Sequence, residues 1–330
     1  MRMIRAEVMG MCFGVRDALK VIEGTSDPRG VTILGQLVHN EVVLGDLKAR
    51  GFAMHEAPTG DRSGELVPGS ERVLITAHGI SERQRLLLES AGKTLIDTTC
   101  PLVVRAHQAA QALQAQGYHV LVIGRKAHVE VQGIIGDLTS VNVIESELDA
   151  QDYAQPRLGV LCQTTATERQ VATIRSAIAA RNPDAEIRYI DTICLPTKEH
   201  QRSLGRLLER VDAVVVVGGR NSNNTRELVD LCRQRGRPVV HVQSPSDLDP
   251  AWFQGFAAVG LTAGTSTLER TINEVHRALV WIGSHDSGTL PGHLESQPGT
   301  PARTARRVCR ACEDAPFCED APSCETVRLW

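Results

Sequence analysis

Two phrases of nearly the same sequence decide how this chain is organised. They read Asp97-Thr98-Thr99-Cys100-Pro101 and Asp191-Thr192-Ile193-Cys194-Leu195-Pro196. Each follows a short run typical of a β-strand and precedes a helical pattern. Cys12 occupies a third place of this kind, after a strand-like run over residues 4–9 and before a helical stretch that begins at Val15. The cysteines recur at intervals of about 90 residues, which predicts three units of similar size.

Helical patterns follow the cysteines. Apolar residues recur at helical spacing in two of these stretches, at Leu102, Ala106, Ala109 and Leu113 and at Leu204, Leu207, Leu208 and Val211. A proline close behind the cysteine suits the first turn of a helix. Because short apolar strands alternate with these helices, we expect an α/β fold with parallel sheets.

Each unit contains two more strand-like runs that end in a polar turn. The first set of turns is Val38-His39-Asn40, Ala127-His128-Val129-Glu130 and Asn221-Ser222-Asn223-Asn224. The second set is Ala77-His78-Gly79, Gln163-Thr164-Thr165 and Thr262-Ala263-Gly264-Thr265-Ser266. Parallel sheets bind ligands beyond the carboxyl ends of their strands. If the three units close around a pseudo-threefold axis, these side chains converge on one pocket, although spacing alone does not establish closure.

The repeated order of strand, cysteine and helix predicts the unit boundaries. We expect α/β units over residues 13–99, 100–193 and 194–283, with residues 1–12 joining the third unit. Residues 284–330 read as a linker followed by a cysteine-rich tail, because Ser, Gly, Pro and His replace the apolar pattern there. With few core-forming residues, this tail is expected to have little structure of its own.

Nine cysteines need an explanation, and an odd number favours metal or redox chemistry over structural disulfides. A cysteine at a helix start has its thiolate stabilised by exposed N–H groups. Three thiolates from remote places can hold a metal centre and leave one position open, and they suit zinc or an iron–sulfur cluster. Cys162 and Cys232 are instead expected to be small core residues.

His39, His78 and His128 each occupy a strand-end turn, beside hydroxyl and amide side chains that suit a phosphate or diphosphate. Glu130 shares the turn of His128, and a carboxyl group in a partly dry pocket can deliver protons. Thr164 either positions a substrate hydroxyl or caps the helix that follows.

Composition excludes several classes of function. Lys and Arg total 36 against 39 Asp and Glu, a net charge of −3 that gives no electrostatic reason to expect a nucleic-acid partner. No apolar run is long enough to span a membrane. The first residues lack the apolar core of a signal peptide, so a cytoplasmic location is expected. The G-x-G-x-x-G and Walker A motifs are absent.

Eight ordered phrases together resemble one family, the 4-hydroxy-3-methylbut-2-enyl diphosphate reductases (the IspH/LytB family). They are Gly10-Met11-Cys12-Phe13-Gly14-Val15, Val38-His39-Asn40, Ala77-His78-Gly79, Thr99-Cys100-Pro101-Leu102-Val103, His128-Val129-Glu130-Val131, Gln163-Thr164-Thr165, Asn221-Ser222-Asn223-Asn224 and Thr262-Ala263-Gly264-Thr265-Ser266. The resemblance covers residues 1 to about 282.

The resemblance implies a trefoil of three α/β units around a central [4Fe–4S] cluster. Its ligands would be Cys12, Cys100 and Cys194. The diphosphate would be held by His39, His78, His128, Ser222, Asn223, Asn224 and Ser266. Glu130 would supply protons, with His128 beside it, and Thr164 would orient the substrate hydroxyl. The reaction would consume two electrons and two protons, expel water, and yield isopentenyl and dimethylallyl diphosphate. This is the last step of the methylerythritol phosphate route to isoprenoids, and a ferredoxin or flavodoxin would donate the electrons.

Three features depart from the usual family pattern. Phe13 follows the first cysteine where Ala is common, and Asn223 stands where the diphosphate loop often has Ser. The tail adds Cys309, Cys312, Cys318 and Cys324, which would bind a further metal or form a flexible segment without one. Two alternatives remain open at this point: a related enzyme that reduces another phosphorylated substrate, and a non-catalytic iron–sulfur redox sensor.

Overall fold

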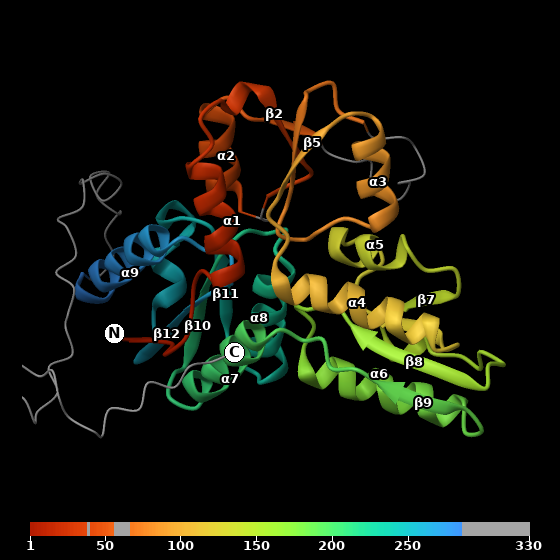
Figure 1. The fold of residues 1–330 in the computed structure, drawn as a ribbon. Helices are drawn as coiled ribbons and strands as arrows, with labels where there is room; N and C mark the ends of the chain where they lie inside the picture. Colours follow the sequence, from red (N-terminus) through yellow and green to blue (C-terminus); the bar gives the residue numbers. More distant parts are fainter. Residues whose placement is uncertain (38–39, 56–66, 286–330) are drawn as a thin grey trace, which may run out of the picture. The chain divides into compact units, whose positions relative to one another are not determined.

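The computed structural model describes residues 1–37, 40–55 and 67–285. Within these ranges, three four-stranded sheets account for the strands, and every pairing between neighbouring strands is parallel (Figure 1). The expected α/β class with three similar units is therefore confirmed.

The three sheets share one strand order. The N-terminal sheet runs β3 (Ala53–His55), β2 (Val31–Leu34), β4 (Arg72–Ile75), β5 (Thr94–Asp97). The middle sheet runs β7 (Val141–Ile144), β6 (His119–Ile123), β8 (Arg157–Cys162), β9 (Glu186–Tyr189). The C-terminal sheet runs β11 (Val239–Val242), β10 (Ala213–Val217), β12 (Ala258–Ala263), β1 (Arg2–Arg5). In each sheet the strand before a predicted ligand cysteine is the edge strand: β1, β5 or β9.

Helices connect the strands and cover the sheets. They are α1 (Phe13–Glu23), α2 (Glu41–Ala49), α3 (Glu82–Ser90), α4 (Pro101–Ala115), α5 (Val129–Ile135), α6 (Glu168–Arg181), α7 (Leu195–Leu208), α8 (Asn223–Gln234) and α9 (Glu269–Ser284). Four short 3₁₀ turns complete the described elements: η1 (Pro28–Gly30), η2 (Glu147–Asp149), η3 (Pro245–Asp247) and η4 (Pro250–Phe253). No helix in the described ranges is long and apolar enough to cross a membrane.

Apolar side chains on both faces of the sheets form the core. In β10 all five residues are buried, with Val215 packing in the cluster that contains α9 and Val214 in the cluster that contains α7 and α8. The middle sheet lies in the same way between α4 and α6 (Figure 1). Burial on both faces explains why these strands read as continuous apolar runs rather than alternating ones. Cys162 and Cys232 belong to this core, as expected.

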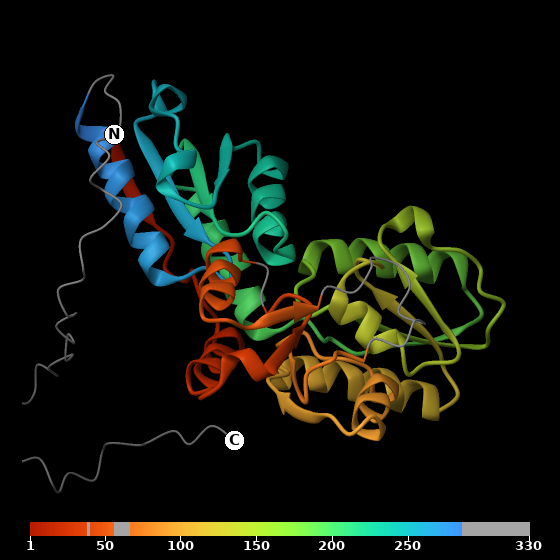
Figure 2. The same ribbon diagram turned by 90° about the horizontal axis from the view of Figure 1, so that it is seen from above.

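The first strand ends earlier than its sequence predicts. The run over residues 4–9 predicts a strand, but β1 ends at Arg5. Beyond it the Val8 N–H donates to the Ser203 hydroxyl of α7 at 2.9 Å, so the chain leaves the sheet there. Figure 2 shows β1 alongside α9, near the N-terminus.

The buried face of α4 is also shifted from the predicted one. Val103, Ala106, Ala110 and Leu113 are buried, rather than the expected set with Leu102 and Ala109. The shift has a local cause, because Leu102 turns toward a cavity that is described below.

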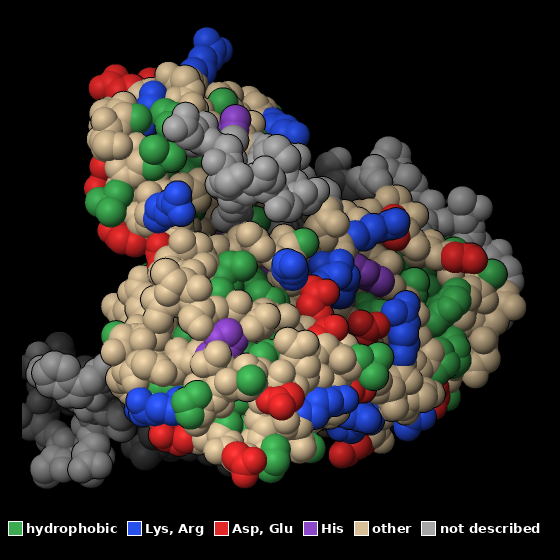
Figure 3. Space-filling model, turned by 90° about the vertical axis from the view of Figure 1, so that its right-hand side faces the viewer, with side chains coloured by type: hydrophobic (Ala, Val, Ile, Leu, Met, Phe, Trp, Pro, Cys, Tyr) green, Lys and Arg blue, Asp and Glu red, His purple; other side chains and the backbone are tan. Residues whose placement is uncertain are grey.

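Charged side chains of both signs are interspersed on the face drawn in Figure 3. Ion pairs such as Arg157–Glu186 and Arg202–Glu168 join exposed side chains at 3.1 Å. Exposed pairs of this kind contribute little to stability, so the fold depends mainly on its apolar core.

A glycine in a central strand lets a helix approach closely in two sheets. A Cβ on Gly260 would lie 2.9 Å from Leu207 Cδ2 of α7, and one on Gly159 would lie 3.0 Å from Leu113 of α4. We therefore expect Gly260→Ala to lower the free energy of unfolding by about 1–3 kcal/mol through overpacking, measured by urea denaturation.

Gly205→Ala is the matched control. Gly205 lies in α7 with no atom within 4 Å of the position of an added Cβ, so the alanine should stabilise the helix by up to about 1 kcal/mol. Equal effects of the two substitutions would show that the contact with Leu207 does not limit the packing.

Candidate active site

A cavity lies where strands of all three sheets end and the next helices begin. It encloses about 660 Å³, part of it open to solvent. Its lining includes three cysteines, two histidines, an acid and a set of small polar residues: Cys12, Cys100, Cys194, His78, His128, Glu130, Thr164, Thr165, Ser222, Asn223, Asn224, Thr265 and Ser266. The fold thus brings together every predicted site residue in the described ranges. His39 and the four tail cysteines lie outside the described residues.

The repeated phrase positions two of the cysteines by the same hydrogen bonds. Asp97 accepts from the Thr99 N–H at 2.8 Å, as Asp191 does from the Ile193 N–H at 3.1 Å. These side-chain bonds close a tight turn after the strand.

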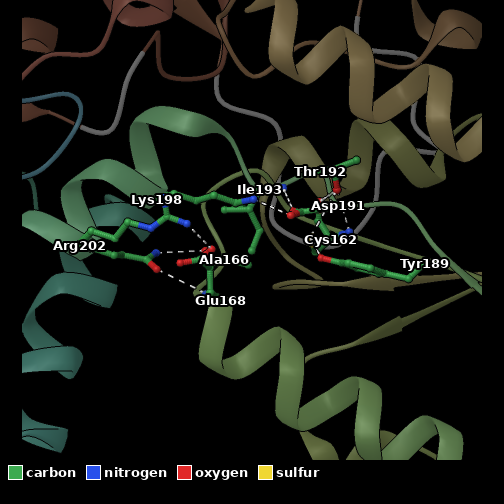
Figure 4. A network of polar contacts seen from close by, with 10 residues as sticks. Cys162, Ala166, Glu168, Tyr189, Asp191, Thr192, Ile193, Lys198 and Arg202 are labelled. Atoms are coloured by element: carbon green, nitrogen blue, oxygen red, sulfur yellow. Dashed lines mark hydrogen bonds and ion pairs between the residues drawn. The ribbon is translucent and has the colours of Figure 1, made fainter. Parts of the chain in front are cut away.

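The threonine of each phrase fastens that turn to the neighbouring strand. Thr98 donates its hydroxyl to the carbonyl of Ile75 at 2.6 Å, and Thr192 donates to the carbonyl of Cys162. Figure 4 shows the second of these networks, in which Asp191 also pairs with Lys198. The matching sequences therefore encode matching geometry.

A backbone hydrogen bond then fixes each cysteine. The N–H of Cys12 donates to the carbonyl of Thr265 at 3.0 Å, that of Cys100 to Ala77 at 3.1 Å, and that of Cys194 to Thr164 at 2.9 Å. Each acceptor is a residue of a strand-end turn that itself lines the cavity. The three bonds are equivalent in the three sheets.

Each cysteine is also the N-cap of a helix: Cys12 of α1, Cys100 of α4 and Cys194 of α7. The side chain of each cysteine makes no capping hydrogen bond to its helix. The N–H groups of the first turn still act on the sulfur and favour the thiolate. Burial nevertheless raises the pKa of all three thiols, that of Cys194 to about 11, against the opposing effect of those N–H groups. Without a bound cation the thiols are protonated, and a soft metal would release the protons.

The donor set suits a cluster better than a single ion. Sulfurs on one tetrahedral zinc lie within about 4 Å of each other, given Zn–S bonds of about 2.3 Å. In the described part of the chain, no three His, Cys, Asp or Glu side chains are arranged to hold one ion. Three thiols around one cavity, each at the start of a different helix, fit a cofactor with several metal atoms.

His128 is the N-cap of α5, and its Nδ1 accepts a hydrogen bond from the Glu130 N–H at 3.2 Å. Because Nδ1 is the acceptor, the neutral ring carries its proton on Nε2 and can donate from there. The His78 ring meets the His128 ring edge to face, with centroids 5.4 Å apart. Two imidazoles from different sheets therefore stand side by side at the cavity.

Glu130 is buried and held by one residue. The Thr164 N–H donates to Oε1 at 2.6 Å, and the Thr164 hydroxyl donates to Oε2 at 2.9 Å. Burial raises the pKa of Glu130 to about 7, and the bonds from Thr164 oppose the rise only in part. Thr164 is not the helix cap, because Thr167 caps α6. A carboxyl group with such a pKa can hold a proton at neutral pH and release it.

Hydrogen-bond donors without partners point to an anionic ligand. Asn224 Oδ1 accepts from the Thr265 N–H at 3.0 Å, which leaves its Nδ2 without a partner among the described residues. The Ser266 hydroxyl is likewise buried and unbonded within the described ranges. Ser222 caps α8, whose N-terminal N–H groups add a partial positive charge. No Lys or Arg of the described chain lines the cavity.

Two asparagines connect neighbouring units at the rim. Asn40 donates Nδ2 to the carbonyl of Ser266 at 2.7 Å. Asn223 donates Nδ2 to the Thr165 hydroxyl at 3.0 Å and to the Thr165 carbonyl at 3.3 Å. Because the Asn223 amide nitrogen donates to Thr165, the atom of this side chain without a partner among the described residues is Oδ1. An oxygen that only accepts hydrogen bonds is poorly suited to bind an anion. Sequence reasoning missed the linking role of Asn40 and Thr165, because no local pattern marks a bond between distant turns.

The sequence and the structure of the chain are similar to those of one known protein family. The model of the LytB protein family matches residues 3–280. A 4-hydroxy-3-methylbut-2-enyl diphosphate reductase of Methylibium petroleiphilum is 36% identical over 300 residues, which are 88% of each chain. The structure of E-1-hydroxy-2-methyl-but-2-enyl-4-diphosphate reductase from Plasmodium falciparum matches with a TM-score of 0.76 at 26% identity, covering 84% of this chain and 88% of that one. A structure of (E)-4-hydroxy-3-methyl-but-2-enyl diphosphate reductase, the terminal enzyme of the non-mevalonate pathway, matches with a TM-score of 0.59 at 32% identity, covering 85% and 100%.

The link from Asn223 to Thr165 can be tested by stability. Asn223→Ala removes two partly buried hydrogen bonds and should lower the free energy of unfolding by about 1–3 kcal/mol, as measured by urea denaturation. Asn221→Ala changes an exposed neighbour and should alter that free energy by less than about 0.5 kcal/mol. Indistinguishable midpoints for the two variants would contradict a structural role for Asn223.

Proposed function

The chain belongs to the LytB family, and from this membership we propose that it removes the allylic hydroxyl of 4-hydroxy-3-methylbut-2-enyl diphosphate by two-electron reduction. The products are isopentenyl and dimethylallyl diphosphate, and the chain is an oxidoreductase of the non-mevalonate route. The observation that carries this proposal is the buried pair of Glu130 and Thr164, which shares one cavity with three cysteines at N-cap positions and a set of anion-binding donors.

The cofactor we propose is one [4Fe–4S] cluster held by Cys12, Cys100 and Cys194. Three thiols from remote parts of the sequence, each at a helix N-terminus and all on one cavity, support this assignment. When bound, such a cluster supplies electrons and, at an iron that lacks a protein ligand, a Lewis acid. The chain contributes the N–H groups of three first turns, which stabilise negative charge on the thiolates.

The diphosphate binds, in this proposal, to His78, His128, Ser222, Asn224 and Ser266, with His39 added on the evidence of the sequence. His128 donates from Nε2, and the Asn224 amide and Ser266 hydroxyl supply two buried donors. The N-terminal N–H groups of α5 and α8 add to the positive field. Binding of the diphosphate also positions the reacting carbon, because the binding free energy of the remote group offsets the entropy lost when the reacting carbon is oriented.

Glu130 supplies protons in this proposal. The reaction consumes two electrons and two protons, breaks the carbon–oxygen bond and forms one carbon–hydrogen bond, with the hydroxyl leaving as water. Hydroxide is a poor leaving group, so protonation at this oxygen lowers the barrier. The Thr164 hydroxyl lies 2.9 Å from Glu130 Oε2 and is placed to orient the substrate hydroxyl beside the acid.

A ferredoxin or flavodoxin is the proposed electron donor, and a cytoplasmic location remains a prediction. A further metal at the tail cysteines also remains a prediction. A redox sensor without catalysis does not require a buried acid beside a set of diphosphate donors. No feature of the cavity favours such a sensor, and none favours a different phosphorylated substrate.

Glu130→Gln tests the proposed proton donor. Turnover should fall at least about 100-fold while the iron content per chain stays unchanged. Because the folded pKa lies near 7, the acid is protonated below that pH. Wild-type turnover should therefore decline as the pH rises through about 7, and the variant should lack this limb.

Glu227→Gln is the matched control. Burial also raises the pKa of Glu227 to about 7, but that residue lies outside the cavity. Its replacement should leave turnover and the pH profile unchanged. A profile altered by Glu227→Gln and unaltered by Glu130→Gln would contradict the assignment.

Gly14→Ala tests the proposed cluster ligands. A Cβ on Gly14 would lie 2.5 Å from Cys100 Sγ, so the alanine must displace that sulfur. We expect iron per chain after anaerobic purification to fall severalfold, with the helical circular dichroism retained. Gly45→Ala in α2, with no neighbour within 4 Å of an added Cβ, should bind iron like the wild type. Full iron in Gly14→Ala would show that Cys100 is not a ligand.

A further inference from the structure

The segment that carries Cys12 lacks the side chains that fix the other two proposed ligands. In the phrases described above, an aspartate closes the turn before the cysteine, and a threonine fastens that turn to the neighbouring strand. The corresponding residues before Cys12 are Met9 and Gly10, which have no side-chain oxygen for these bonds. Gly10 also has a φ of +83°, a conformation that glycine adopts more readily than other residues. The position of Cys12 therefore depends on other contacts.

The same segment also falls out of register with the strand beside it. The Ala6 N–H donates to the Leu261 carbonyl at 2.8 Å. The next such bond runs from the Gly10 N–H to the Ala263 carbonyl at 3.3 Å, so the first segment advances four residues while its partner advances two. At the other two ligand cysteines the paired segments advance equally. Two extra residues thus loop out of the sheet just before Cys12.

Helix α7 supplies the hydrogen bonds that hold this loop. The Val8 N–H donates to the Ser203 hydroxyl at 2.9 Å, and His200 Nε2 lies 3.0 Å from the Gly10 carbonyl oxygen. Carbonyl oxygens accept hydrogen bonds and do not donate them, so the ring is the donor toward Gly10. Nδ1 of the same ring lies 2.7 Å from the carbonyl oxygen of Pro196, in the first turn of α7.

These contacts connect the segment before Cys12 with the helix that begins at Cys194. Cys194 is the N-cap of α7, and His200 reaches from the first turn of this helix to the residue two places before Cys12. The side chains of His200 and Ser203 are 3% and 2% exposed. Loss of a buried hydrogen bond is costly, so both bonds restrain the loop. Neither residue lines the cavity, and both therefore act on it through Cys12.

We propose that His200 is the positioning residue for Cys12, with Ser203 beside it on α7. The two side chains do for the Cys12 segment what the aspartate and the threonine do before the other two cysteines. They fix the loop from outside the segment, because the segment has no side chain of its own for this purpose. The inference rests on the proposed function, in which Cys12 is a ligand of the cluster. Residues that orient a metal ligand from behind it strongly affect metal affinity.

Two polar substitutions separate the two contacts of the ring. His200→Gln places an amide nitrogen near the position of Nε2 and can keep the bond to Gly10. His200→Asn reaches only the position of Nδ1 and loses that bond. In the anaerobically purified full-length protein, iron loss to a chelator should be at least about tenfold faster in His200→Asn than in the wild type. His200→Gln should lose iron at the wild-type rate.

Thiol reactivity gives a second readout, which needs no metal. The same variants are stripped of iron, and alkylation of each cysteine by iodoacetamide is followed by mass spectrometry. Cys12 should react about fivefold faster in His200→Asn, the effect of one lost hydrogen bond. Cys100 should react at the wild-type rate, because its own aspartate and threonine remain. Ser203→Ala, a milder change, should raise the reactivity of Cys12 selectively as well, and it decides the question if His200→Asn does not fold.

His119→Asn is the matched control. Both ring nitrogens of His119 also lie within hydrogen-bond distance of oxygen atoms, but the residue begins β6 and does not line the cavity. Its replacement should leave iron loss and both alkylation rates unchanged. Equal behaviour of His200→Gln and His200→Asn would overturn the proposal, as would parallel rises at Cys12 and Cys100. If the wild type binds no iron, the proposed cofactor fails, and the alkylation rates alone then decide the role of His200.

Discussion

The cavity depends on one backbone hydrogen bond that occurs three times. The N–H of each helix-capping cysteine donates to the carbonyl of a neighbouring strand-end turn, at Thr265, Ala77 and Thr164. The bond fixes the cysteine at the point where an edge strand gives way to a helix. It also ties that cysteine to a turn that itself lines the cavity. Three sheets of the same strand order repeat the arrangement, and the reactive groups gather at one place.

This arrangement decides the electrostatics of the cavity. The N-cap residues of α1, α4, α5, α7 and α8 all line it, so the partial positive charges of these helix starts lie at the cavity. No Lys or Arg of the described chain is part of the lining. The cavity is therefore suited to bound negative charge, on thiolates and on a diphosphate, without a Lys or Arg side chain from the described residues. Burial acts in the opposite sense on Glu130: it disfavours the carboxylate, raises the pKa of this group to about 7 and makes it an acid at neutral pH.

Local sequence predicted most of this fold because the phrases around Cys100 and Cys194 are themselves local devices. The aspartate closes a turn two residues on, and the threonine fastens that turn to the adjacent strand. The order of the strands and the buried face of α4 depend on contacts between distant segments. The helical spacing alone therefore predicts Leu102 on the buried face, whereas in the structure it borders the cavity. The bond between Asn223 and Thr165 is similarly nonlocal. The roles assigned to the site residues, and the exact boundaries of the three units, stay predictions.

Mössbauer spectroscopy of the anaerobically purified protein, before and after addition of 4-hydroxy-3-methylbut-2-enyl diphosphate, tests the proposed cluster most directly. Three cysteines and an open position predict a four-iron cluster in which one iron differs from the other three. The signal of that iron alone should shift when the substrate is added. A centre whose irons are all equivalent and do not respond to the substrate would contradict the account, as would zinc in place of iron.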